Sequence, residues 1–359
     1  MYILSQSAFL PIMRVKSVLI SAAMNSSNSN KATVSLPVSS PALLPRALLK
    51  QVATEPREML KECREFKRLP RLFADSTHQA WSCLQGDAKY VLKVCAVEAV
   101  NKSSFWKGIQ RLFGFDFIES LARYPEVYRQ VSKMSPLTVP TLLAATSGKR
   151  DVSNEWDDET CQHESGFLLT SFLPGKVVES VSVQKNHIEQ LAKHITALHH
   201  FQQTFFGPLF APTFSVEEWQ ENLQEVLQLF ALNTSAELAD VELEIVNSVL
   251  RQVTDLKVQK FYPIMPDLRW DQFLESDEGQ LCLVDLDAVV WGPRELELVL
   301  MEYLLDSSQL RLFKEIYTQS HAVPALGPVR DVYRLLLFTM NVLGETDLKK
   351  WMEHPVRFE

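Results

Sequence analysis

The order of the predicted secondary structure is the feature of this sequence that most limits its fold. Apolar runs of strand length come first, and segments with helical spacing of apolar residues dominate after Pro174-Gly175. The predicted strands are Ala80–Leu84, Lys89–Cys95, Thr138–Ala145 and Gly166–Phe172, and the predicted helices are 47–67, 117–134, 186–201, 216–230, 236–253, 295–305, 309–320 and 329–343. A short hairpin lies among the later helices. This distribution predicts an α+β fold with a small antiparallel-sheet lobe and a larger helical lobe.

The chain divides into three predicted segments. Residues 1–46 are expected to form a flexible tail, because the later part of this segment is rich in Ser, Asn and Pro. Residues 47–173 form the small lobe, and residues 174–359 form the helical lobe. The mildly apolar beginning of the tail leaves a weak signal peptide and a later start, at Met13 or Met24, both open.

The charge and the cysteine content exclude several classes of protein. A net charge of -8 without a dense Lys/Arg block argues against a nucleic-acid partner. The five cysteines are widely spaced and form no Cys-x-x-Cys pair, which indicates a reducing compartment and no zinc site. No stretch has the ~20 consecutive apolar residues of a membrane span. We therefore expect a cytoplasmic protein without a membrane partner.

The stretch from Met265 to Asp287 carries the residues best suited to chemistry. Asp267 is followed five positions later by Gln272, and Asp285 ends the apolar run that starts at Leu281. In phosphoryl transfer to a hydroxyl, one Asp orients the acceptor, while an amide five positions later and a second Asp hold magnesium. The spacing therefore predicts Asp267 as the catalytic residue, with Gln272 and Asp285 as magnesium ligands.

The remaining motifs resemble the aminoglycoside phosphotransferase and choline kinase family, which has a protein-kinase-like fold. The resemblance covers about Phe73 to Trp351 and is carried by Tyr90-Val-Leu-Lys-Val, Phe167-Leu-Leu-Thr-Ser-Phe-Leu-Pro-Gly and Gly292-Pro-Arg-Glu-Leu-Glu-Leu. It implies two lobes with a nucleotide-binding sheet in the smaller one.

The resemblance also implies how ATP is bound. Lys93 would bind the nucleotide phosphates, and Glu126 would pair with Lys93, with Glu119 as the second choice. The phosphate loop and the hinge strand would supply the other nucleotide contacts, at Ser76, Thr77, Ser171 and Leu173.

The sequence departs from the family at several of these positions. Met265-Pro266 stands where the family commonly has His-Gly, and Glu297 stands where it usually has Asp. Gln272 replaces Asn, and its extra methylene moves the amide oxygen by roughly 1.5 Å. The phosphate loop Asp75–Ala80 contains no glycine.

The sequence thus predicts an ATP- and magnesium-dependent phosphotransferase that acts on a hydroxyl of a small molecule. One alternative is a catalytically silent nucleotide-binding or scaffolding protein, which Gln272, Met265 and the glycine-free loop favour. Another is a kinase of a lipid-linked or cell-envelope sugar, suggested by the basic-aromatic stretch Phe105–Phe113. That stretch could equally be an amphipathic helix packed on the small lobe.

Five further polar residues each have a functional and a structural interpretation. Arg269 and Asp271 either serve the substrate or form a surface ion pair, and Asp287 is expected in a turn or facing the substrate. His199 and His200 are expected to pack or cap helices, because no Cys or carboxylate stands at ligand spacing from them.

Overall fold

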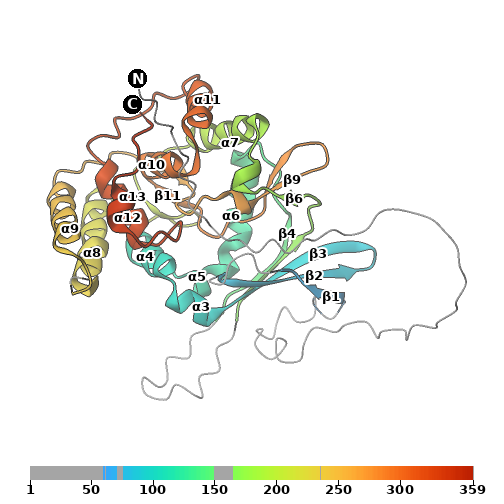
Figure 1. The fold of residues 1–359 in the computed structure, drawn as a ribbon. Coiled ribbons are helices and arrows are strands. Elements are labelled where there is room, and N and C mark those ends of the chain that lie inside the picture. The colour runs from blue at the N-terminus through green and yellow to red at the C-terminus, as the bar shows by residue number, and fades with distance from the viewer. Residues whose placement is uncertain (1–59, 61, 71–75, 149–164, 235, 359) are drawn as a thin grey trace, which may run out of the picture. The chain divides into compact units, whose positions relative to one another are not determined.

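The computed structural model describes residues 60, 62–70, 76–148, 165–234 and 236–358 (Figure 1). The predicted tail, residues 1–46, and nearly all of the acidic segment at 148–165 lie outside the described residues. The described part has an α+β architecture, with a sheet lobe followed by a helical lobe. None of its helices is long and apolar enough to cross a membrane.

The small lobe is built on a five-stranded antiparallel sheet with the order β1-β2-β3-β5-β4. Its strands are β1 (Arg64–Arg68), β2 (His78–Gln85), β3 (Ala88–Cys95), β4 (Leu142–Thr146) and β5 (Phe167–Ser171). The predicted strands Ala80–Leu84 and Lys89–Cys95 are confirmed as β2 and β3, which form a hairpin with Gly86 at a φ of 59° in the turn between them. Lys93 lies opposite Ala80 on one side and Leu168 on the other, which places it in the middle of the sheet.

The expected helix over 47–67 is wrong at its end, because Arg64–Arg68 is strand β1. The charged sequence Arg-Glu-Phe-Lys-Arg looks helical, but the strand pairs with β2 and buries Phe66 against Cys83 and Leu92. Packing at the sheet therefore decides the local structure here, as it commonly does for strands.

Between β3 and β4 the chain forms a run of short helices. These are α3 (Val97–Lys102), α4 (Ser104–Phe113), α5 (Phe117–Ser120), the single 3-10 turn η1 (Leu121–Arg123) and α6 (Tyr124–Met134). Pro125 lies in the first turn of α6, as predicted, where its missing N–H costs no hydrogen bond.

Helix α4 packs mainly on the helical lobe. It contacts α8 (Val216–Thr234) and α12 (Arg330–Thr339), and Gly108 allows the close approach of Met340. Trp106 is buried and stacks on Phe117, with 4.0 Å between the ring centroids. The aromatic side chains that suggested a membrane-facing stretch are therefore part of the core.

The helical lobe contains seven α-helices among its described residues. They are α7 (Lys185–Leu198), α8, α9 (Asp240–Val253), α10 (Arg294–Leu304), α11 (Ser307–Tyr317), α12 and α13 (Leu348–Met352). Two small sheets connect them, with the orders β10-β9-β6 and β7-β11-β8. Their strands are β6 (Lys176–Val177), β7 (Gly207–Pro208), β8 (Tyr262–Ile264), β9 (Phe273–Glu275), β10 (Leu281–Leu283) and β11 (Val290–Gly292), and two 3-10 turns, η2 (Ser180–Ser182) and η3 (Trp270–Gln272), complete the lobe.

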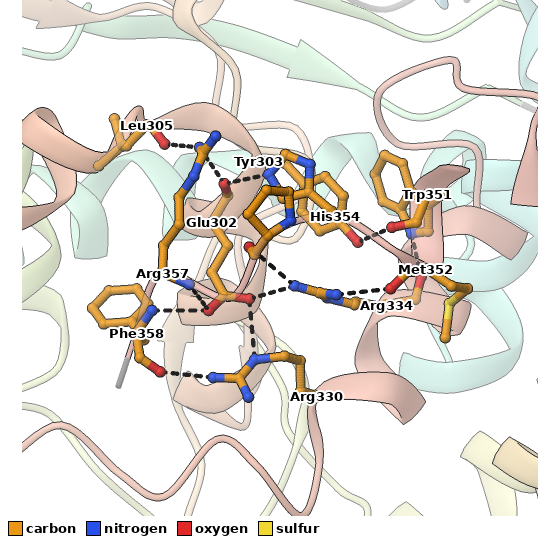
Figure 2. A network of polar contacts seen from close by, with 11 residues as sticks. Glu302, Tyr303, Leu305, Arg330, Arg334, Trp351, Met352, His354, Arg357 and Phe358 are labelled. Atoms are coloured by element: carbon orange, nitrogen blue, oxygen red, sulfur yellow. Dashed lines mark hydrogen bonds and ion pairs between the residues drawn. The ribbon is translucent and has the colours of Figure 1, made fainter. Parts of the chain in front are cut away.

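A buried carboxylate ties residues 357 and 358 to the helical lobe (Figure 2). Glu302 on α10 is fully buried and accepts hydrogen bonds from Arg334 Nη2 at 3.0 Å and Arg330 Nε at 3.2 Å. The backbone N–H groups of Arg357 and Phe358 donate to the same carboxylate, each at 3.0 Å. A buried charge is tolerated when it is paired and hydrogen-bonded in this way.

Candidate active site

The two lobes enclose a cleft with a volume of about 1490 Å³. The sheet strands β2 and β3 line one side of it, and the stretch around Asp267 and Asp285 lines the other. Residues at the start of α4 and at Met340–Val342 also line it. Seven of the nine site residues predicted from the sequence line this cleft, namely Ser76, Thr77, Lys93, Ser171, Leu173, Asp267 and Asp285.

Lys93 and Asp285 meet directly in the cleft. The Lys93 ammonium donates to Asp285 Oδ1 and to the Val284 carbonyl, each at 3.1 Å. Only 15% of the Lys93 side chain and 35% of the Asp285 side chain are exposed. Burial alone would lower the pKa of Lys93, but the charges of Asp285 and Asp287 outweigh it and raise that pKa. Lys93 is therefore a stable cation beside the predicted metal carboxylate.

The expected pairing of Lys93 with Glu126 is wrong. Glu126 is half-exposed, and its carboxylate accepts from Arg129 Nε at 3.1 Å and from Gln130 Nε2 at 2.7 Å. The second choice, Glu119, is exposed on α5.

Helical periodicity explains the error. The buried face of α6 is formed by Tyr124, Val127, Tyr128 and Val131, spaced three or four residues apart. Glu126 falls outside this stripe, and the spacing of these residues in the sequence could have shown it.

Asp267 is held by the amide that was predicted to bind magnesium. Gln272 Nε2 donates to Asp267 Oδ2 at 3.1 Å and to the Asp267 carbonyl, also at 3.1 Å. The other end of the amide, Gln272 Oε1, accepts from the Arg269 backbone N–H at 3.1 Å. Because Gln272 is buried and does not line the cleft, its oxygen supports the loop in this arrangement and does not point into the cleft.

The carboxylates of the site shift one another's pKa. Burial raises the pKa of Asp267 to about 7, and the negative charge of Asp285 adds to the effect. Burial, followed by the charge of Asp287, also raises the pKa of Asp285, although Lys93 opposes this. Asp267 is thus poised near neutrality, where a general base works best.

His78 and Asp287 form a direct side-chain contact that the sequence analysis did not find. His78 Nδ1 lies 3.0 Å from Asp287 Oδ2, and both side chains are more than nine-tenths buried. Burial opposes ionisation of Asp287, but Lys93 and His78 outweigh it and lower its pKa. His78 lies at the start of β2 and Asp287 follows β10, so no local spacing in the sequence could reveal this pair.

A second buried network fixes the backbone before Asp267. The backbone N–H of Met265 donates to Glu297 Oε1 at 2.7 Å, and Glu297 is fully buried. His199 Nε2 lies 3.0 Å from Glu297 Oε2, and His199 Nδ1 lies 2.8 Å from the Tyr317 hydroxyl. His199 is therefore more than a packing residue, because it orients the carboxylate that supports the loop.

The predicted nucleotide-binding residues differ in whether their polar groups already form hydrogen bonds within the protein. The Ser76 hydroxyl donates to the His78 carbonyl at 3.2 Å, and the Thr77 carbonyl accepts from Ala96 N–H at 2.8 Å. Ser171 exchanges hydrogen bonds with the Thr141 backbone through its own N–H and hydroxyl. Among the described residues, none forms a backbone hydrogen bond with Leu173, which leaves that position open to a ligand.

The cleft offers oxygen ligands of the kind that magnesium prefers. Asp285 lines the cleft with a partly exposed carboxylate, and Asp287 Oδ1 is buried without a hydrogen-bond partner among the described residues. These two carboxylates fit a magnesium ion, whereas the amide of Gln272 does not in its present hydrogen bonding. No cluster of three or more His, Cys, Asp or Glu ligands is found in the described part of the chain.

Solved structures of known proteins share the fold. The choline kinase LicA from Streptococcus pneumoniae superposes with a TM-score of 0.50 at 15% identity, covering 82% of this chain and 87% of that chain. The aminoglycoside phosphotransferase APH(4)-Ia gives 0.49 at 13% identity, with coverages of 79% and 86%. The macrolide 2'-phosphotransferase MphH from Brachybacterium faecium gives 0.47 at 11% identity, with coverages of 81% and 93%.

At such low identity the choline kinase structure shows the fold alone, which is the predicted two-lobed kinase-like fold. No curated protein sequence matches the chain. The sequence model of the phosphotransferase enzyme family matches residues 71–335, which is well over half of the chain and includes Lys93, Asp267 and Asp285. The protein therefore belongs to the phosphotransferase enzyme family.

Proposed function

We propose that this protein is an ATP- and magnesium-dependent phosphotransferase that acts on a hydroxyl of a small molecule. The observation that carries the proposal is the gathering of Lys93, Asp285 and Asp267 in one cleft between the lobes. The cleft volume of about 1490 Å³ exceeds the roughly 300–1,000 Å³ that is typical of a single ligand pocket. There is accordingly room for a nucleotide together with an acceptor.

Each residue has a distinct role in this proposal. Asp267, with its pKa raised to about 7, orients the acceptor hydroxyl and takes its proton. Lys93 binds the nucleotide phosphates, and Asp285 with Asp287 holds the metal. A bound magnesium ion would neutralise the charge that develops on the transferred phosphoryl group. Gln272 positions Asp267 through its amide N–H.

The acceptor hydroxyl would lie beside Asp267 in this cleft. Solved structures with a similar fold are named for choline, aminoglycoside and macrolide kinases, so their acceptors differ widely. We therefore propose the acceptor only as a small molecule with a hydroxyl group.

A catalytically silent nucleotide-binding protein is the second candidate. It is favoured by Gln272, whose amide oxygen is already occupied by the Arg269 N–H, and by the ion pair that Lys93 forms with Asp285. In this candidate the cleft would bind a nucleotide without transferring phosphate.

The test measures nucleotide affinity with and without magnesium, together with basal ATP hydrolysis. The variants are Asp267→Asn and Asp285→Asn, and Asp277→Asn is the matched control because Asp277 is exposed in the β9–β10 turn. We expect Asp267→Asn to abolish hydrolysis, Asp285→Asn to weaken magnesium-dependent binding, and the control to behave like the parent. If magnesium does not improve binding and hydrolysis is equal in all four proteins, the enzyme proposal fails.

A further inference from the structure

Helix α6 presents two phenols, and no carboxylate, on its buried face. Tyr124 and Tyr128 are spaced four residues apart and are 1% and 4% exposed. The Tyr124 hydroxyl donates to the Asp287 carbonyl, so this face of α6 meets the loop that carries the site carboxylates. Glu126 lies on a different face and pairs with Arg129.

Lys93 consequently depends on the carboxylate that the metal needs. Asp285 is the carboxylate that forms an ion pair with Lys93 in the described part of the chain. A metal ion bound to Asp285 would compete with the ammonium for the same oxygens. Since Lys93 is only 15% exposed, it then needs other partners to stay in place.

Tyr128 is placed to be one of these partners. Its hydroxyl is buried and has no hydrogen-bond partner among the described residues. Tyr128 lies one helical turn from Tyr124, on the same buried face of α6, and this face meets the loop of Val284 and Asp285 that the Lys93 ammonium contacts. An ammonium has three N–H donors, and two of those on Lys93 go to Val284 and Asp285. A buried hydroxyl without a partner is costly, so one beside a lysine with a spare donor calls for an explanation.

We propose that Tyr128 is the positioning residue of Lys93: its hydroxyl accepts a hydrogen bond from the ammonium once a metal ion at Asp285 and phosphates at Lys93 have separated the Lys93–Asp285 pair. The inference rests on the proposed function and assigns to a neutral phenol the role that the sequence predicted for Glu126. Because the Tyr128 phenol is neutral, it does not offset the positive charge with which Lys93 binds the phosphates. Nucleotide and magnesium should therefore bind as a unit, because each releases one half of the Lys93–Asp285 pair.

The test is calorimetric titration of a non-hydrolysable ATP analogue, with and without magnesium. It compares the parent with Tyr128→Phe, which removes only the hydroxyl, and with Glu126→Gln as the matched control on the same helix. A hydrogen bond to a charged group corresponds to about tenfold in affinity. We expect Tyr128→Phe to weaken magnesium-dependent binding by about that factor, and Glu126→Gln to leave it unchanged.

A double-mutant cycle separates positioning from a general effect on the fold. In a Lys93→Met background, Tyr128→Phe should cause no further loss, because it acts through the missing ammonium. Equal binding by the parent and Tyr128→Phe would overturn the inference. So would a loss that persists in the Lys93→Met background, or a loss in Glu126→Gln as large as that in Tyr128→Phe. If the parent itself binds no magnesium nucleotide, the proposed function falls first and the inference falls with it.

Discussion

The carboxylate of Asp267 should cost the protein stability at neutral pH, and its removal should recover that stability. Its pKa is raised from an ordinary value of 3.8 to about 7, mainly by burial and then by the charge of Asp285. The folded state therefore holds this proton more tightly than the unfolded state does. Stability falls as the pH rises from 3.8, and the whole cost is present above pH 7.

The size of the effect follows from the two pKa values. A rise from 3.8 to about 7 corresponds to about 4 kcal/mol, at about 1.4 kcal/mol per pH unit. This is an upper limit, because Asp267 lines the cleft and keeps some contact with solvent. With about 2.1 cal/mol/K of unfolding entropy per residue, it corresponds to at most about 5 °C in the unfolding midpoint of a chain of this size.

The assay is thermal unfolding of the parent and Asp267→Asn between pH 5 and pH 8.5, in a buffer with a chelator. The variant should be more stable than the parent, and the difference should grow up to about pH 7 and then level off. Asp277→Asn, at an exposed position of the neighbouring turn, should show no such trend. A difference that stays constant with pH, or a variant less stable than the parent at pH 8, would refute the reasoning.

Two more predictions concern stability. Glu302→Gln keeps the shape of a fully buried side chain but leaves Arg334 without its charge partner, which should cost about 3–5 kcal/mol in urea unfolding; an unchanged midpoint would contradict the role of Glu302. Gly166→Ala would place a Cβ atom 2.5 Å from the Thr146 carbonyl and should destabilise by about 1–3 kcal/mol. The control is Gly327→Ala, whose Cβ meets nothing within 4 Å. Equal unfolding midpoints for the two variants would show that the structure around Gly166 accommodates the added Cβ atom without loss of stability.

The sequence was sufficient where structure depends on local pattern. The apolar runs of strand length located β2 and β3, and the helical spacing of apolar residues located α8. Strand β1 was missed because its stability comes from pairing with β2 and from burial of Phe66, and neither is encoded in the five residues themselves.

The candidate site shows the same limit. The spacing within the stretch from Met265 to Asp287 was enough to place Asp267 and Asp285 in one cleft. The partner of Lys93 depends on which face of α6 is buried and on how the lobes meet, so the choice of Glu126 was wrong. His78 reaches Asp287 across the cleft, and such a contact leaves no trace in either local sequence.

The docking of α4 on the helical lobe also restricts how the cleft can open. Helix α4 connects the sheet strand β3 with α6, yet it rests on α8 and α12. If the sheet rotated rigidly about its connection after β5, the contacts of α4 with α8 and α12 would oppose the rotation. Opening must therefore bend the backbone at two further places, between β3 and α3 and around Gly114, where α4 ends with a φ of 64°. A movement of the small lobe would thus bend the chain at three connections outside the sheet, and not at a single hinge.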